Sequence, residues 1–276
     1  MEFYKAHGIG NDFVLIDART TADRDWPELA RAMCDRHFGV GADGILLVLN
    51  SATADFRMRM LNPDGSEAEM CGNGIRCFAR YVYENVAPKA ELRVETGAGV
   101  LPLTLRVRDG VVEAVTVNMG APHFTPRDIP VVLDHSPVVD HPLDVGGMTL
   151  RLTCVSMGNP HAVAFVEEDV ESFPLAEIGP LVERHPLFPR RVNFEVCRVL
   201  GRGELDVRVW ERGAGLTLAC GTGASAVTVA ARLKGLTDER IRLRLPGGTL
   251  EMSWDGQGDV FMTGPAEFVF RGEWLK

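Results

Sequence analysis

The sequence predicts an α+β protein made of two similar halves, each a mainly antiparallel sheet that curls like a barrel around one central helix. Three observations support this prediction. Strand patterns outnumber helix patterns, and hairpin-type turns join many of them. A cysteine followed by Gly-x-Gly and an amphipathic run occurs twice, at Cys71 and at Cys220. A segment with five prolines, residues 119–147, separates the two copies and is the best candidate for a linker.

In the first half, alternating apolar residues and turn signals predict strands at 3–7, 13–17, 45–49, 56–61, 92–96, 100–107 and 111–118. A helix is predicted from Trp26 to Arg36, with Asp25 as N-cap and Pro27 in its first turn. A second helix is predicted after Cys71, because apolar residues recur there at the spacing of a buried stripe: Ile75, Phe78, Ala79 and Val82.

The second half repeats this order. Strands are predicted at 148–156, 161–166, 193–200, 205–210, 241–245, 249–254, 260–263 and 267–270, and the last is expected to cross back to the first half. A helix is predicted at 175–183. The helix after Cys220 has no charged residue before Arg232, which predicts burial on most of its faces. Lys234-Gly235 is its predicted C-cap.

The composition is that of a globular protein, with 46% hydrophobic and 24% charged residues among 276. A chain of this length has room for two domains. We expect the first domain to comprise residues 1–118 and 265–276 and to carry Cys71. The second is expected to comprise residues 119–264 and to carry Cys220.

The charge limits the possible partners. A formal net charge of −9 argues against nucleic acid and against an acidic membrane surface, because binding either would require a basic face. No apolar run approaches the ~18 residues of a membrane-spanning helix. The first residues, Met-Glu-Phe-Tyr-Lys-Ala-His-Gly, lack the basic and then apolar pattern of an export signal. We therefore expect a cytoplasmic protein.

The six cysteines include no Cys-x-x-Cys pair, which argues against a zinc ribbon and against a disulfide framework. No metal site is expected, and reduced thiols are the simplest interpretation. Four cysteines lie within apolar patterns and are predicted to be buried packing residues: Cys34, Cys77, Cys154 and Cys197.

The other two, Cys71 and Cys220, are each placed at a predicted helix N-terminus, where free N–H groups and the helix dipole favour a thiolate. Taken singly, each could equally be a small apolar residue at a helix start, but the duplication favours a functional pair. A disulfide oxidoreductase would normally carry Cys-x-x-Cys, and a cysteine hydrolase needs only one thiol with a histidine. Two thiols, one charged and one neutral, suit removal of a proton from one face of a carbon and its return to the other. A racemase or epimerase requires this chemistry.

Such a reaction has an acidity problem, because the α-proton of an amino acid is far less acidic than a thiol. Two helix N-termini that converge on one carboxylate in a closed cavity would stabilise the carbanion through fixed dipoles. The sequence shows no pyridoxal or nucleotide signature, and Gly213-Ala-Gly215 has no third glycine at the required spacing. We therefore expect a reaction without a cofactor.

Two further stretches are candidates for substrate recognition. Glu211 and Arg212 end a predicted strand and form either a surface ion pair or a recognition pair. In the second case Arg212 would bind a carboxylate and Glu211 an ammonium group. Asn159 and His161 open another predicted strand. A lone histidine is more often structural than catalytic, so both interpretations of His161 stay open on this pattern alone.

Together these motifs closely resemble the diaminopimelate epimerase family, cofactor-independent enzymes of lysine and peptidoglycan-precursor biosynthesis. The resemblance covers essentially the whole chain and keeps the family's order. Its motifs are Gly8-Ile-Gly-Asn-Asp-Phe13, Asn62-Pro-Asp-Gly-Ser66, Met70-Cys-Gly-Asn-Gly-Ile-Arg76, Met157-Gly-Asn-Pro-His161, Arg191-Val-Asn193, Glu211-Arg-Gly213 and Ala219-Cys-Gly-Thr-Gly-Ala224.

The resemblance implies two pseudo-symmetric domains that close over the substrate, and a homodimer. It implies conversion of LL-2,6-diaminopimelate to meso-diaminopimelate with Cys71 and Cys220 as the acid/base pair and with His161 and Glu211 beside the thiols. Backbone N–H groups would hold the reacting carboxylate at Gly72, Asn73, Gly221 and Thr222. Six side chains would bind the distal amino-acid end: Asn11, Asn62, Asn159, Asn193, Glu211 and Arg212.

Two positions depart from the family pattern: Gly44 stands where some members have glutamine, and Leu216 stands where an acid would follow Gly-x-Gly. Alternatives are a racemase or isomerase of the same fold acting on histidine, proline or a phenazine precursor, an inactive member, and a redox sensor whose two thiols form a regulatory disulfide. A proline-type racemase would not need Glu211, Arg212 and four asparagines. The intact cysteines and glycine turns weigh against an inactive member, whereas the sensor remains open.

Overall fold

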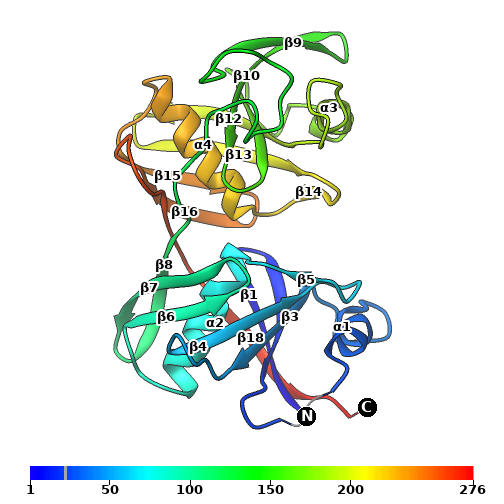
Figure 1. Ribbon diagram of the computed structural model, residues 1–276, viewed down its shortest axis with the longest axis vertical. Helices are drawn as coiled ribbons and strands as arrows, with labels where there is room; N and C mark the ends of the chain where they lie inside the picture. The colour runs from blue at the N-terminus through cyan, green and yellow to red at the C-terminus, as the bar shows by residue number, and fades with distance from the viewer. Residues whose placement is uncertain (22–23, 276) are drawn as a thin grey trace. The chain divides into compact units, whose positions relative to one another are not determined.

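The computed structural model describes residues 1–21 and 24–275. The chain divides into two compact units, one formed by Met1–Asn118 with Thr263–Lys276 and the other by Met119–Met262. The described part of each unit combines helices with a mostly antiparallel set of strands, so the predicted α+β class is confirmed. Figure 1 shows helix α2 among the strands of the first unit and helix α4 among those of the second.

The strands of the first unit are β1 (Glu2–Gly8), β2 (Asn11–Asp17), β3 (Gly44–Leu49), β4 (Phe56–Leu61), β5 (Glu67–Ala68), β6 (Glu91–Thr96), β7 (Gly99–Arg108), β8 (Val111–Asn118) and β18 (Glu267–Glu273). β1 is antiparallel to β2 and to β18, so β18 returns to the beginning of the chain. β2 is parallel to β3, β3 antiparallel to β4, and β4 antiparallel to β5 and parallel to β6. β6, β7 and β8 form a meander, and β17 (Phe261–Gly264), at the boundary between the units, pairs with β8.

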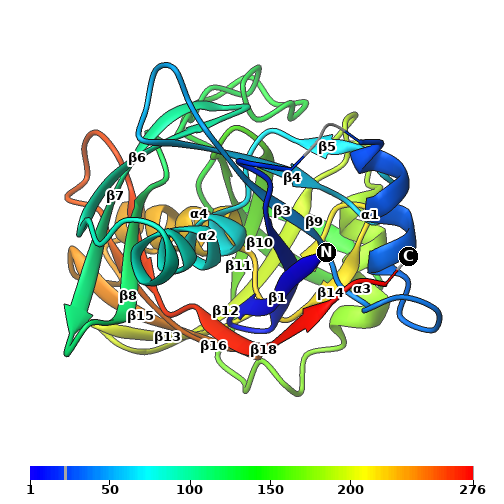
Figure 2. The same ribbon diagram turned by 90° about the horizontal axis from the view of Figure 1, so that it is seen from below.

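Helix α2 (Gly72–Asn85) is the central helix of this unit. The predicted stripe residues Ile75, Phe78, Ala79 and Val82 are all fully buried, and the helix contacts β1, β2, β3, β4, β7 and β8. Helix α1 (Trp26–Cys34) lies on the other face of β3 and β4 from α2, as Figure 2 shows. Neighbouring residues of β3 point to opposite faces of the sheet. This strand therefore contributes to both packing layers.

Helix α1 begins as predicted but ends two residues early. The Asp25 side chain accepts a hydrogen bond from the N–H of Glu28 and caps the N-terminus. The helix was expected to reach Arg36 but ends at Cys34. The carboxylate of Asp35 accepts hydrogen bonds from the N–H groups of His37 and Phe38 and thereby stabilises a turn. This local bonding competes with continuation of the helix.

The second unit repeats the order of the first. Its elements are β9 (His141–Val145), β10 (Met148–Ser156), β11 (Pro160–Phe165), α3 (Leu175–Glu183), β12 (Asn193–Gly201), β13 (Glu204–Glu211), β14 (Gly215–Thr217), α4 (Gly221–Leu233), β15 (Arg240–Leu245) and β16 (Gly248–Ser253). β10, β11, β12 and β13 pair antiparallel, parallel and antiparallel, as β1 to β4 do. β13 is then antiparallel to the short β14 and parallel to β15, which follows α4. The internal symmetry expected from the two cysteine motifs is thus present in the strand pairing.

Helix α4 is buried as its sequence predicts. Every residue from Gly223 to Ala231 is buried, and the helix packs against β10, β11, β12 and β16. Gly235 has a φ of 68°, a left-handed conformation that ends the helix at the predicted position. A helix held from several sides fixes the direction of its N-terminus, where Cys220 lies.

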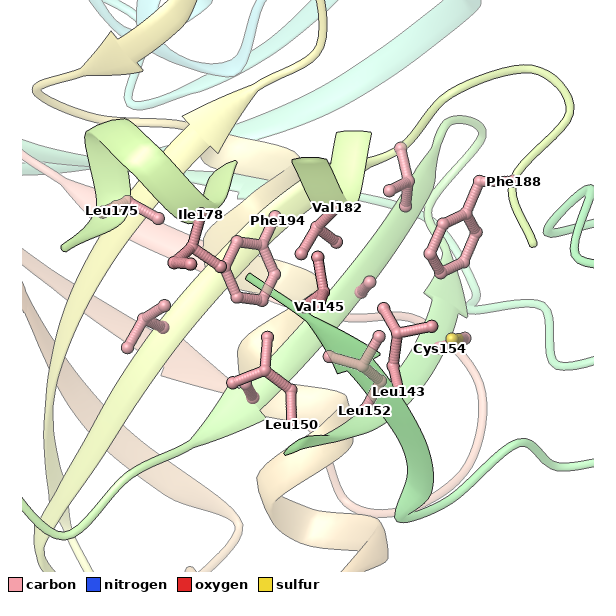
Figure 3. Packing of buried hydrophobic residues seen from close by; sticks show 14 of the residues in the cluster. Leu143, Val145, Leu150, Leu152, Cys154, Leu175, Ile178, Val182, Phe188 and Phe194 are labelled. Carbon is pink, nitrogen blue, oxygen red and sulfur yellow. The ribbon is translucent and has the colours of Figure 1, made fainter. Parts of the chain in front are cut away.

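A second layer of the core lies between α3 and the other face of the sheet. Figure 3 shows Phe194 of β12 packed with Ile178 and Val182 of α3 and with Leu150 of β10. The segment 119–147, the best linker candidate in the sequence, is not a separate linker in the structure. Residues of this segment, Ile129, Val131 and Val138 among them, are buried in the same cluster. The segment therefore folds as part of the second unit, because its apolar residues between the prolines have a core to pack against.

Candidate active site

Cys71 caps the N-terminus of α2, as predicted. Its Sγ accepts a hydrogen bond from the N–H of Gly74 at 3.4 Å. The thiol itself faces Oδ1 of Asn11, at 3.7 Å, and the same oxygen accepts a hydrogen bond from Nδ2 of Asn73 at 3.2 Å. Asn11 and Asn73 are therefore brought together with the thiol in the first unit.

Asp43 supports this group of residues and was not predicted. Its Oδ2 accepts a hydrogen bond from Nδ2 of Asn11 at 2.7 Å, which fixes the amide with its oxygen toward Cys71. Its other oxygen pairs with Arg36, which also pairs with Asp12. The sequence signal was an acidic residue within Gly39-Val-Gly-Ala-Asp-Gly44, directly before a buried strand.

Arg76 introduces a positive charge into the same half-site. Its side chain is fully buried and donates hydrogen bonds to the carbonyl oxygens of Gly72 and Pro265. Burial lowers the pKa of Arg76 to about 10, and electrostatic interaction with Cys77 and Cys71 partly offsets this effect. The sequence placed Arg76 in the cysteine motif without giving it a role.

Three first-unit positions remain to be placed: Asn62, Gly72 and Gly44. Asn62 donates a hydrogen bond to Oγ of Ser66 within its own turn, and no contact described for it reaches Cys71. Gly72 is buried at the start of α2. At Gly44 a Cβ atom would lie 2.7 Å from the carbonyl oxygen of Leu61, so the backbone here has no room for a glutamine without a shift of β4.

Cys220 occupies the matching position at the N-terminus of α4. Its Sγ accepts a hydrogen bond from the N–H of Gly223 at 3.3 Å and lies 3.5 Å from Oγ1 of Thr222. The side chain is buried, with 8% of its surface exposed, and Gly221 beside it is buried as well. Both predicted cysteines therefore have the same local geometry.

Next to Cys220 lies a chain of polar side chains. Oγ1 of Thr222 accepts a hydrogen bond from Nδ2 of Asn159 at 3.1 Å, and Oδ1 of Asn159 lies 2.9 Å from Nε2 of His161. Nδ1 of His161 lies 2.7 Å from Oε1 of Glu195, and both of these side chains are fully buried. Asn159, His161 and Thr222 were predicted site residues, whereas Glu195 was not.

Glu211 also interacts with the thiol of Cys220. It accepts a hydrogen bond from Thr217 at 2.7 Å. Burial raises the pKa of Glu211, and hydrogen bonds from Thr217 and Cys220 partly offset the effect. Burial, followed by the charges of Glu211 and Glu195, raises the pKa of Cys220 well above its ordinary value. Cys220 is therefore a thiol that needs a nearby base to ionise.

Replacement of Glu211 by glutamine is expected to lower the pKa of Cys220, because it removes a negative charge beside the sulfur. A larger fraction of Cys220 is then thiolate at a given pH, so its alkylation by iodoacetamide becomes faster and begins at lower pH. Peptide mass spectrometry at a series of pH values measures this change. Glu204→Gln, at the other end of the same strand, is the control without effect. An unchanged pH profile in Glu211→Gln would contradict the electrostatic argument.

Asn193 positions the turn that carries Arg212. Its Oδ1 accepts a hydrogen bond from the main-chain N–H of Arg212, and its Nδ2 donates one to the carbonyl oxygen of Pro160. The guanidinium of Arg212 is exposed and donates to the carbonyl oxygen of Arg190 at 3.1 Å. Leu216, the second departure from the family pattern, is 48% exposed in β14.

The four other cysteines are buried and free, as predicted. Among residues 1–21 and 24–275, no group of three or more His, Cys, Asp or Glu side chains is arranged to hold a metal ion. None of the described helices is long and apolar enough to cross a membrane.

Comparison with known proteins gives a consistent result. A family model described as "Diaminopimelate epimerase" matches residues 3–125 and 153–269. Relatives named "Diaminopimelate epimerase" include that of Moorella thermoacetica, 55% identical over 99% of both chains. That of Desulfitobacterium hafniense is 52% identical over 100% of this chain and 99% of the relative.

Solved structures of low identity share the fold. A phenazine biosynthesis protein of the PhzF family from Bacillus anthracis superposes with a TM-score of 0.73 at 20% identity, covering 100% of this chain and 99% of the other. A probable proline racemase from Agrobacterium radiobacter K84 superposes with a TM-score of 0.71 at 17% identity, covering 99% and 92%. The predicted two-domain fold is thereby confirmed.

Proposed function

Because the chain belongs to the diaminopimelate epimerase family, we propose that it converts LL-2,6-diaminopimelate to meso-diaminopimelate, a step of lysine biosynthesis. The reaction uses two cysteine side chains as acid and base, without a cofactor. The observation that carries the proposal is the repeated half-site, in which a cysteine caps a helix N-terminus in each unit. The chemistry requires the two units to present their sulfur atoms to opposite faces of one α-carbon.

The helix N-termini have two roles in this proposal. Each sulfur accepts a hydrogen bond from a backbone N–H, that of Gly74 or of Gly223, which stabilises the thiolate form. The N–H groups of Gly72, Asn73, Gly221 and Thr222 bind the carboxylate attached to the reacting carbon. Negative charge that develops there during proton removal meets fixed dipoles, so little reorganisation is needed in the transition state.

The two thiols have opposite electrostatic surroundings, which supports a thiolate and a thiol in the same molecule. Arg76 places a buried positive charge close enough to Cys71 for the two to interact. Glu211 and Glu195 place negative charges near Cys220. Glu211 accepts the proton of Cys220 when that sulfur must become the base, and His161 supplies a second polar group beside the site. Reversing the direction of epimerisation exchanges the roles of the cysteines.

The distal amino-acid end distinguishes diaminopimelate from simpler amino acids. Arg212 binds its carboxylate and Glu211 its ammonium group. The asparagines Asn11, Asn62, Asn159 and Asn193 complete the recognition. Asn193 also fixes the main chain of Arg212. The protein acts on this small molecule as a cytoplasmic homodimer, with no nucleic acid or membrane partner.

The test is a solvent-exchange assay in heavy water over a panel of LL-diaminopimelate, proline and histidine. Deuterium is expected at the inverted α-carbon of diaminopimelate only. Arg212→Met is expected to lower kcat/KM for diaminopimelate about 10–100-fold, because a hydrogen-bonded charge is lost. Arg242→Met, which changes an exposed arginine of β15, is the control with unchanged kcat/KM. Retention of the original proton in the product, or exchange of proline instead, would contradict the proposal.

A further inference from the structure

Glu195 is a buried carboxylate whose chemistry the proposed reaction does not yet use. It lies in β12 beneath helix α4, with none of its side chain exposed. Oε1 contacts His161, and Oε2 is buried without a hydrogen-bond partner among the described residues. A carboxylate in such surroundings is strongly unfavourable unless a positive charge compensates it.

His161 is the group that can provide this charge. The titratable side chains that interact with Glu195 or lie against it come from β10, β11, β12, β13 and the start of α4: Cys154, His161, Cys197, Glu211 and Cys220. All of them except His161 are neutral or negative. The 2.7 Å separation between Nδ1 of His161 and Oε1 of Glu195 is that of a charge-assisted hydrogen bond.

The hydrogen-bond directions from His161 to Cys220 follow from this pair. Nε2 of His161 faces an amide oxygen, Oδ1 of Asn159, which can only accept, so Nε2 carries a proton. Nδ2 of Asn159 donates to Oγ1 of Thr222. The hydroxyl proton of Thr222 is then free to point to Sγ of Cys220, 3.5 Å away.

We propose that Glu195 is a positioning residue that holds a proton on each ring nitrogen of His161, so that Asn159 keeps its orientation and the Thr222 hydroxyl donates to Cys220. The sulfur then accepts two hydrogen bonds, from Thr222 and from the N–H of Gly223. Both stabilise the thiolate when Cys220 acts as the base. The effect on turnover rests on the proposed function, whereas the protonation of His161 does not.

The first measurement is ¹⁵N NMR of histidine-labelled protein without substrate, with the His161 signal assigned by its loss in His161→Asn. Both ring nitrogens of His161 are expected to be protonated at neutral pH in the native protein. In Glu195→Gln the glutamine amide can donate to Nδ1, so His161 is expected to become neutral with its proton on Nε2. A native His161 with either ring nitrogen unprotonated would overturn the proposal, whatever the activity assay shows.

The second measurement is a kinetic cycle. Glu195→Gln keeps the direction of each hydrogen bond between His161 and Cys220, so it is expected to retain most of kcat. Glu195→Leu is expected to lower kcat about 10–100-fold with little change in KM, as for other residues that orient a reacting group through a neighbour. In a Thr222→Val background the hydrogen bond from the Thr222 hydroxyl to Cys220 is already lost, so Glu195→Leu should lower kcat little further. Fully multiplicative losses, or equal losses in Glu195→Gln and Glu195→Leu, would overturn the proposal.

Discussion

Replacement of either Cys71 or Cys220 by alanine is expected to reduce epimerisation of LL-diaminopimelate by about 10³-fold or more, because a positioned acid or base typically contributes 10²–10⁴-fold. The loss should be similar for both, since each turnover needs one group to remove a proton and the other to return one. Steady-state kcat for both directions of the reaction, with product configuration determined by chiral chromatography, measures the effect.

Cys34→Ala is the matched control. Cys34 is likewise a thiol outside any disulfide, but it is buried in α1 and caps no helix. Burial raises its pKa to about 11, so it is an inert packing residue at neutral pH. Its alanine variant should keep kcat. Full activity in Cys71→Ala or in Cys220→Ala would reject the two-base mechanism while leaving the family assignment intact.

Replacement of Gly223 by alanine is expected to disturb the second half-site through the addition of a single methyl group. The new Cβ would lie 2.8 Å from Oε1 of Glu195 and 3.3 Å from Sγ of Cys220. The buried helix start cannot move away freely, so we expect a loss of stability of about 1–3 kcal/mol from overpacking. Displacement of the sulfur by a fraction of an ångström to 1 Å should lower kcat by up to about 10²-fold.

Gly203→Ala is the control for this substitution. Position 203 belongs to the same unit, and its added Cβ would meet no atom within 4 Å. Its free energy of unfolding should change by no more than about 0.5 kcal/mol, with kcat unchanged. Urea unfolding and steady-state kinetics of both variants are compared. If Gly223→Ala kept the native kcat, the close approach of Glu195 to α4 would have no catalytic importance.

The sequence predicted the family, the enzyme class and the fold, and these are confirmed. These predictions succeeded because each cysteine is followed by glycines and by apolar residues at helical spacing. This local pattern is enough to predict a helix with the cysteine at its N-terminus. The predicted positions of Cys71 and Cys220 at helix N-termini are likewise present in the structure. The catalytic and binding roles of the site residues remain predictions.

What the sequence did not indicate depends on contacts between distant segments. Glu195 lies in β12 next to the apolar residues Phe194, Val196 and Cys197, and a single acid in such a run is normally taken to be an exposed position. Its burial follows from the parallel pairing of β12 with β11, which brings it beside His161. Asp43 meets Asn11 through the equivalent pairing of β3 with β2. In both cases, the only sequence signal was an acidic residue within or directly before a run of apolar residues.

The pairing of β18 with β1 also bears on the order in which the protein can form. The second unit is a continuous segment, whereas the sheet of the first unit includes a strand from the far end of the chain. Domains generally fold as units while synthesis proceeds. The half with Cys220 can therefore form from one continuous stretch of chain, whereas the half with Cys71 keeps an open sheet edge at β1 until β18, residues 267–273, has been made. The half that is translated first is the last to be closed.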